Sequence, residues 1–131
     1  MKKKIVISVV CLLVVAVMFF GGKFLYGMLR YKSIIEDTQI KTPDISQIQD
    51  GVYNGSFDAV IISADVDVTV QGYKIVGIVI NEHKSGRGAP AESIIDEVLT
   101  TQSLEVDAIS GATNSSKVIL KAIENALEIQ E

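Results

Sequence analysis

The sequence has 131 residues, of which 48% are hydrophobic and 6% aromatic, and Cys11 is its one cysteine. Residues 33–131 carry six basic and sixteen acidic side chains, a formal charge of 6 − 16 = −10, which argues against nucleic-acid binding. A single thiol excludes an internal disulfide and a cysteine-based metal centre. The length allows one compact domain in addition to an N-terminal segment.

Residues 1–32 are predicted to be a membrane anchor. Three lysines precede an uncharged run of 18 residues, 5–22, which spans about 27 Å as a helix. A cleaved signal peptide begins with the same basic and then apolar pattern, but no good small-residue cleavage motif follows the run. A lipoprotein anchor at Cys11 is not expected, because no small residue directly precedes it.

The orientation of this anchor is predicted from its flanking charges. The amino group and three lysines precede the run, whereas Lys23, Arg30 and Lys32 follow it. The positive-inside rule favours, by a narrow margin, a cytoplasmic N-terminus. We therefore expect a single-pass protein of the cell membrane, in contact with the lipid bilayer, whose C-terminal domain is extracytoplasmic. Residues 33–49 are expected to be a juxtamembrane helix or linker broken at Pro43.

The remaining residues, 50–131, are predicted to form a small α+β domain. Residues 52–62 are expected to form a first strand, and residues 65–70 alternate polar and apolar side chains, as a half-buried strand does. After a turn at 71–73, residues 74–80 are rich in β-branched side chains and favour a third strand. Together they predict an antiparallel meander with one face that needs cover.

Two helices are predicted to provide that cover. The first begins near residues 89–92, with Pro90 in its first turn, and has an apolar stripe at residues 94, 95, 98 and 99. The second begins at Asn114 or Ser115 and runs to about Ile129. Its spacing predicts an inward face of Ile119, Ile123, Ala126 and Leu127, and an outward face of Lys117, Lys121, Glu124 and Glu128.

The loop before the second helix combines small residues with a hydroxyl group at Thr113. Unpaired backbone N–H groups and the positive end of the helix dipole favour a phosphate at such a position. Gly111 and Ala112 leave the backbone open to a bulky ligand. The alternative is ordinary helix capping, for which Ser, Thr and Asn are the usual residues. The residue pattern alone leaves both interpretations open.

The segment Asp107-Ala108-Ile109-Ser110-Gly111-Ala112-Thr113 resembles the flavinylation motif of the FMN-binding domain family. This family includes the FMN-carrying subunits of the sodium-pumping NADH:quinone oxidoreductase and of the related electron-transport complex. All five specified positions of the motif match. Residues 50–55 resemble the family's opening DGxYxG strand, residues 72–75 its hairpin, and residues 83–88 a degenerate form of its HxETPGxG loop. The resemblance covers about residues 50–129.

The resemblance implies that a separate FAD:protein FMN transferase joins FMN covalently, through its phosphate, to the hydroxyl of Thr113. The cofactor-binding residues that it implies are Asp107, Ser110, Gly111, Ala112, Thr113, Ser115 and His83. Asp107 would orient the loop or be recognised by the transferase, or else be an ordinary turn residue. His83 would lie near the flavin, or else be an ordinary surface or hydrogen-bonded histidine, because the usual Glu-Thr-Pro after it is missing.

The implied function is that of a membrane-anchored, extracytosolic electron-transfer flavoprotein, which works with a quinone-linked or other flavin oxidoreductase. The sequence shows no nucleophile–base pair and no metal-ligand cluster, so we do not expect the chain to be an enzyme by itself. One alternative is a non-redox binding module of the cell envelope with the same fold but no cofactor. Another is a flavin-dependent reductase domain that acts directly on a small molecule.

Overall fold

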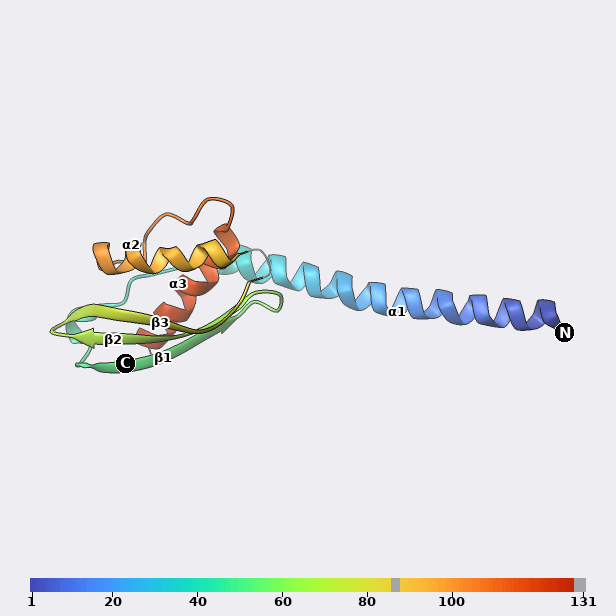
Figure 1. The fold of residues 1–131 in the computed structure, drawn as a ribbon, viewed down its shortest axis with the longest axis horizontal. Coiled ribbons are helices and arrows are strands. Elements are labelled where there is room, and N and C mark those ends of the chain that lie inside the picture. Colours follow the sequence, from blue (N-terminus) through green and yellow to red (C-terminus); the bar gives the residue numbers. More distant parts are fainter. Residues whose placement is uncertain (86–87, 129–131) are drawn as a thin grey trace.

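A computed structural model describes residues 1–85 and 88–128. The elements in chain order are α1 (Lys2–Asp37), the 3₁₀ helix η1 (Ile45–Gln47), β1 (Gly51–Asp58), β2 (Ser63–Gln71), β3 (Lys74–Lys84), the 3₁₀ helix η2 (Ala89–Ser93), α2 (Ile94–Thr101) and α3 (Thr113–Glu128). Helix α1 projects as a long rod from one end of an α+β domain (Figure 1). This arrangement confirms the predicted fold class. The predicted helix end at Ile129 and the loop residues Gly86 and Arg87 lie outside the described residues.

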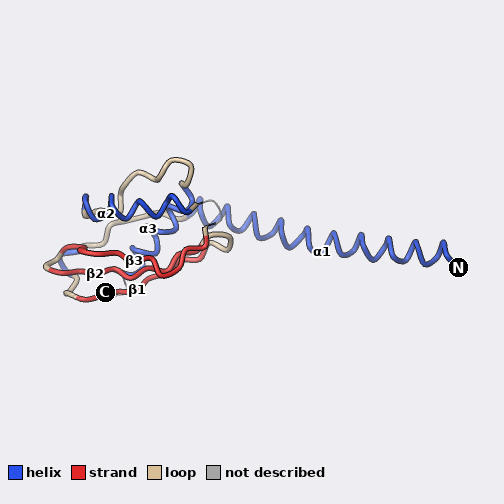
Figure 2. Tube along the Cα trace, in the orientation of Figure 1, coloured by secondary structure: helices blue, strands red, loops and turns tan. Residues whose placement is uncertain are grey.

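The three strands form the predicted antiparallel meander, in the order β1-β2-β3 (Figure 2). In β2, alternation places Val66 and Val68 in the core and Asp65 and Asp67 on the opposite face. The first strand ends at Asp58, earlier than the predicted Ile62. It ends there because the following residues form a turn, in which the backbone N–H of residue 59 donates to the carbonyl of Ile62.

Helix α3 crosses one face of this sheet and is the centre of the core. The side chains of Ile119, Ile123, Ala126 and Leu127 are all buried, as predicted. At Gly55 the strand β1 lies so close to α3 that a Cβ atom would be 2.3 Å from both the carbonyl oxygen of Ala122 and the backbone nitrogen of Ala126. Glycine at this position is therefore what allows β1 to pack against the helix.

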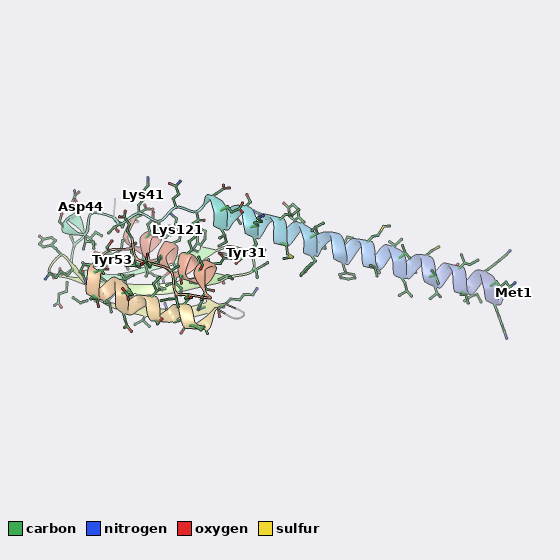
Figure 3. All side chains as sticks on the ribbon, turned by 90° about the horizontal axis from the view of Figure 1, so that it is seen from above. Met1, Tyr31, Lys41, Asp44, Tyr53 and Lys121 are labelled. Atoms are coloured by element: carbon green, nitrogen blue, oxygen red, sulfur yellow. The ribbon has the colours of Figure 1, made fainter. Side chains whose placement is uncertain are left out.

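The prediction that Glu124 faces outward is wrong, because Glu124 is only 2% exposed. Its carboxylate accepts hydrogen bonds from the backbone N–H of Lys41 (3.2 Å) and from Nζ of Lys121 (2.9 Å). The segment between α1 and β1 runs alongside α3 and covers its second face, as the labelled Lys41 and Lys121 show in Figure 3. Ile48 of that segment is also buried. Helix α3 therefore has protein on two faces instead of one.

Helix α1 continues into this domain without a break. It ends at Asp37, which is beyond the predicted boundary at residue 32 and before the predicted break at Pro43. Its final turns pack on the core, where the residue Ile35 is 8% exposed and Tyr31 is partly buried. Nζ of Lys117 donates to the carbonyl of Ile35 at 2.6 Å, a usual way to satisfy the last carbonyls of a helix. The residues after 32 thus join α1 to the domain directly.

The helical segment after β3 begins as the 3₁₀ turn η2, with Pro90 in its first turn, and continues as α2. It ends at Thr101, and the next residue, Gln102, caps it in a left-handed conformation with φ 55°. The side-chain amide of Gln102 accepts from the backbone N–H of Ile75 and donates to the carbonyl of the same residue, both at 2.8 Å. These two bonds imitate the pairing that a further strand would make with β3. On β1, Asn125 Nδ2 similarly donates to the carbonyl of Ser56 at 2.9 Å.

Candidate functional site

The loop before α3 is shaped by a tight turn. The backbone N–H of Ala112 donates to the carbonyl of Ile109 at 2.9 Å, which closes a four-residue turn over residues 109–112. Gly111 is the third residue of this turn and has φ 77°. A type II turn requires a positive φ at this position, and glycine adopts it without strain. The space around Gly111 is open, so its conformation is the reason for glycine here.

Ser116 fixes this turn to the helix. Its hydroxyl donates to the carbonyl of Ala112 at 2.8 Å and accepts from the backbone N–H of Ile109 at 3.0 Å, so it holds both ends of the turn. The side chain is fully buried. Ser116 was not among the predicted site residues. The available signal was a hydroxyl one helical turn after Ala112, where it reaches the carbonyl four residues back.

Thr113 is the first residue of α3, one position before the predicted start, and it is exposed. The backbone N–H groups of the first helical turn have no partner inside the helix. No acidic side chain lies in this turn. The 16-residue helix therefore presents unpaired donors and the positive end of its dipole beside an exposed hydroxyl, which favours an anion at this end.

Thr113 lies on a cavity of about 390 Å³. Its lining residues are Ile62, Ser85, Gly88, Gly111, Ala112, Thr113, Asn114 and Ser115. A Cβ atom on Gly88 would lie 1.8 Å from Oγ of Ser115, so the loop after β3 packs closely against the first turn of α3. Four of the predicted site residues, 111, 112, 113 and 115, are thus brought together in one cavity wall.

Asp107 and Ser110 do not line this cavity. Both line a second one of about 430 Å³ between the loop and α2, together with Glu97, Thr101 and the intervening loop residues. The turn over residues 109–112 separates the two cavities along the chain. The motif is continuous in the sequence, but in the described structure its first residue, Asp107, and its last residue, Thr113, line different cavities.

The side chain of His83 is buried although the residue as a whole is half-buried, contrary to the interpretation as a surface residue. Its side chain is 2% exposed, and Nδ1 lies 3.1 Å from a carboxylate oxygen of Glu92. Among the described residues Nε2 has no hydrogen-bond partner. His83 pairs with Ala64 in the sheet, two residues before Ser85 of the cavity wall, but it does not line the cavity itself. Proximity of His83 to a flavin stays a prediction.

Three lining residues, Ile62, Ser85 and Asn114, were not selected from the sequence. Ile62 and Ser85 reach the wall because β2 and β3 meet the start of α3 at this end of the domain, a contact that no local pattern indicates. Asn114 follows Thr113 directly, and its position in the first helical turn was the available signal. Within the described residues, no group of three or more His, Cys, Asp or Glu side chains could hold a metal ion.

A larger cavity of about 450 Å³ lies between β1 and the end of α3. Its lining residues are Asn54, Gly55, Ser56, Asn125 and Glu128. It lies at the C-terminal part of α3, where the helix dipole disfavours an anion. We therefore assign the candidate site to the cavity of about 390 Å³ at Thr113, which combines an exposed threonine with a helix N-terminus.

Comparison with known proteins shows a family match over the part of the domain that contains this cavity. The model of the family described as "FMN-binding domain" matches residues 61–128, from the end of the β1–β2 turn to the end of α3. The NADH:acrylate oxidoreductase of Vibrio harveyi is 40% identical over 67 residues, which are 49% of this chain and 7% of that protein. No solved structure matches the chain. Since the family model covers more than half of the sequence, the chain belongs to the FMN-binding domain family.

Proposed function

We propose that the chain is a membrane-anchored electron carrier that holds FMN through a phosphoester bond to Thr113. The observation that carries this proposal is the exposed hydroxyl of Thr113 at the first position of α3, in a cavity wall without an acidic residue in the helix's first turn. The cavity volume lies within the range of small-molecule sites. The described residues therefore fit a phosphate attached at this hydroxyl.

The attachment is a transfer reaction that a separate FAD:protein FMN transferase would catalyse. The hydroxyl oxygen of Thr113 attacks the phosphorus on the FMN side of FAD, and the pyrophosphate P–O bond breaks. AMP leaves, and the hydroxyl proton passes to a base of the transferase. Such an enzyme needs an accessible target, which the exposed Thr113 provides. The phosphodiester that results keeps one negative charge, and the first-turn N–H groups of α3 stabilise it.

The loop residues have supporting roles in this proposal. Gly111 gives the turn its positive φ, and Ser116 locks the turn to α3, so the threonine hydroxyl is held at the cavity. Asp107 and Ser110 line the neighbouring cavity, and we propose that the transferase contacts the loop there. When bound, FMN supplies the redox chemistry, and the protein supplies its position.

The cellular setting completes the proposal. Helix α1 is long and apolar enough to cross a membrane, with a mean hydropathy of 2.9 over its most apolar window. We place residues 33–131 on the extracytoplasmic side, where a covalent bond retains the flavin independently of its concentration. The similar Vibrio protein is named for an oxidoreductase reaction, which supports a redox role. The partner would be a quinone-linked or other flavin oxidoreductase.

The decisive test is the mass of the intact protein after co-expression with the transferase. We expect the wild-type chain to gain the mass of one FMN less one water, and its denatured band to fluoresce yellow. Thr113→Ala should lose both signals, whereas Asn114→Ala, a change at the neighbouring exposed residue, should keep them. An unmodified wild-type chain would contradict the proposal and favour the binding-module alternative, and an adduct on Thr113→Ala would place the bond elsewhere.

Sidedness is tested separately with reporters fused after Glu131. An alkaline phosphatase fusion, which is active only outside the cytoplasm, should be active. A fusion of a fluorescent protein that folds only in the cytoplasm should be dark. The opposite pair of results would reverse the proposed orientation.

A further inference from the structure

We propose that α1 is a rigid spacer that points the Thr113 cavity toward the membrane and holds it at a fixed height above the lipid. This inference rests on the proposed membrane anchoring but not on the presence of the flavin. If the Thr113 cavity faces the membrane at a fixed height, a redox partner must present its own cofactor at that height.

The cavity lies at the end of the domain from which α1 emerges. Its wall comes from the β1–β2 turn (Ile62), the loop after β3 (Ser85 and Gly88) and the start of α3 (residues 111–115). Figure 1 shows the β1–β2 turn, the end of β3 and the start of α3 beside the C-terminal end of α1. The β2–β3 turn at Gly72 and Tyr73 lies at the opposite end of the domain (Figures 1 and 2).

The connection between α1 and the cavity is short and built from specific contacts. Nζ of Lys117 donates to the carbonyl of Ile35, and Lys117 lies one helical turn after Thr113 on α3. Ile35 is buried in the core, with Tyr31 and Ile34 packed against it. The helix is continuous from Lys2 to Asp37, without a proline or a flexible linker between the apolar run and these contacts. The domain is thus fixed to the helix rather than tethered to it.

The height follows from helix geometry. Ile35 is 13 residues after Gly22, the end of the uncharged run, so it lies about 20 Å further along the axis. The headgroup layer occupies roughly 5–8 Å of that length, and a tilt of about 20° shortens it only slightly. The junction between α1 and α3 therefore lies roughly 10–15 Å outside the headgroups. A lipid-soluble quinone within the bilayer does not reach this height, so the geometry favours an integral membrane redox protein that projects from the same membrane.

Energy transfer to the membrane surface tests this orientation on the full-length chain. With Cys11→Ser as background, a donor dye is attached at Asn114→Cys, on the cavity, or at Tyr73→Cys, a residue 64% exposed in the β2–β3 turn. The protein is inserted into vesicles with acceptor-labelled headgroups in both leaflets, which makes the direction of insertion irrelevant. We expect greater transfer from position 114 than from position 73.

Two insertions between the exposed residues Met28 and Leu29 then distinguish the effect of the domain's height above the membrane from the effect of its rotation about the axis of α1. Seven polar helix-forming residues lengthen the spacer by about 10.5 Å and rotate the domain by only about 20°, whereas two residues add about 3 Å and rotate it by about 160°. The longer insertion should abolish most of the transfer from position 114. The shorter insertion should leave most of it, because lipid surrounds the helix on all sides.

The outcomes separate this inference from the proposed function. Equal transfer from both positions, or transfer from position 114 that survives the longer insertion, would show a freely tumbling domain and overturn the inference. A chain that does not float with the vesicles would overturn it together with the anchor. The donor is a dye, so a chain that never receives FMN still gives the full readout, and failure of flavin attachment is seen only in the mass measurement.

Discussion

Helices α1 and α3 are buried in opposite ways, although α1 is the more apolar of the two: it contains an uncharged run of 18 residues, whereas nine of the 16 residues of α3 are polar or charged. Among the residues of α1, all of which are described, only Ile35 is buried, and Leu12 and Phe20 are 72% and 70% exposed. In α3, also fully described, ten of 16 residues are buried, and they include two serines and Glu124. Helix α3 finds its apolar surroundings within the domain, whereas the apolar part of α1 has none within the described residues and is long and apolar enough to cross a membrane. Burial is thus decided by what surrounds a helix and not by its composition.

The largest effect is expected from charging α1. The double variant Leu12→Arg with Val15→Arg places two guanidinium groups near the middle of the apolar run. Each arginine raises the free energy of inserting the helix into a membrane by about 2.5–3.5 kcal/mol. We expect the protein to leave the membrane fraction, with an unchanged far-UV circular dichroism of the domain, because neither residue contacts it. Membrane fractionation measures the result. The pair Leu12→Ala and Val15→Ala should remain membrane-bound, and retention of the arginine variant would refute α1 as the anchor.

A smaller effect is expected where β1 meets α3. Gly55→Ala would bring a methyl group within 2.3 Å of two α3 backbone atoms, which must then move apart. We expect a loss of about 3 kcal/mol in the free energy of unfolding, the upper end for overpacking. Chemical unfolding in detergent measures this loss. Gly77→Ala is the matched control, because its Cβ would be 3.7 Å from the nearest atom of Thr69, an ordinary contact. Equal stabilities of the two variants would contradict the close approach.

The smallest effect concerns the second face of α3. Glu124→Ala removes the acceptor for the backbone N–H of Lys41 and for Nζ of Lys121. A hydrogen bond contributes about 0.5–1.5 kcal/mol net, and Lys41 and Lys121 stay partly solvated when the acceptor is removed, so the free energy of unfolding should fall by about 1–2 kcal/mol. Glu97→Ala, at an exposed position of α2, should change it by less than about 0.5 kcal/mol. If both variants were equally stable, the segment around Lys41 would contribute nothing to the cover of α3.

The sequence predicted what depends on local periodicity. The alternation in β2 and the helical spacing of Ile119 and Ile123 correctly gave the sheet, its order and the helix face that covers it. The burial of Glu124 was missed, because its partner Lys41 is 83 positions away and a charged residue at that spacing normally faces solvent. The end of α1 at Asp37 was missed for the same reason, since its last turns are stabilised by contacts with α3.

The candidate site was predicted in part. The small residues and the hydroxyl of Thr113 identified the start of α3, because the type of residue that begins a helix is a local property. The separation of Asp107 from Thr113 was not predicted, since it results from the turn that Gly111 and Ser116 create. The burial of His83 depends on its pairing with Ala64 and on Glu92 of η2, neither of which is apparent from the residues around it.

The bidentate contact of Gln102 has a consequence for solubility. A three-stranded sheet has two free borders, and unsatisfied main-chain groups on them invite pairing with a neighbouring molecule. Gln102 occupies both main-chain groups of Ile75 on one border, and Asn125 occupies the carbonyl of Ser56 on the other. Copies of this domain that meet at high local concentration are thereby protected at these two points from pairing through their sheet edges.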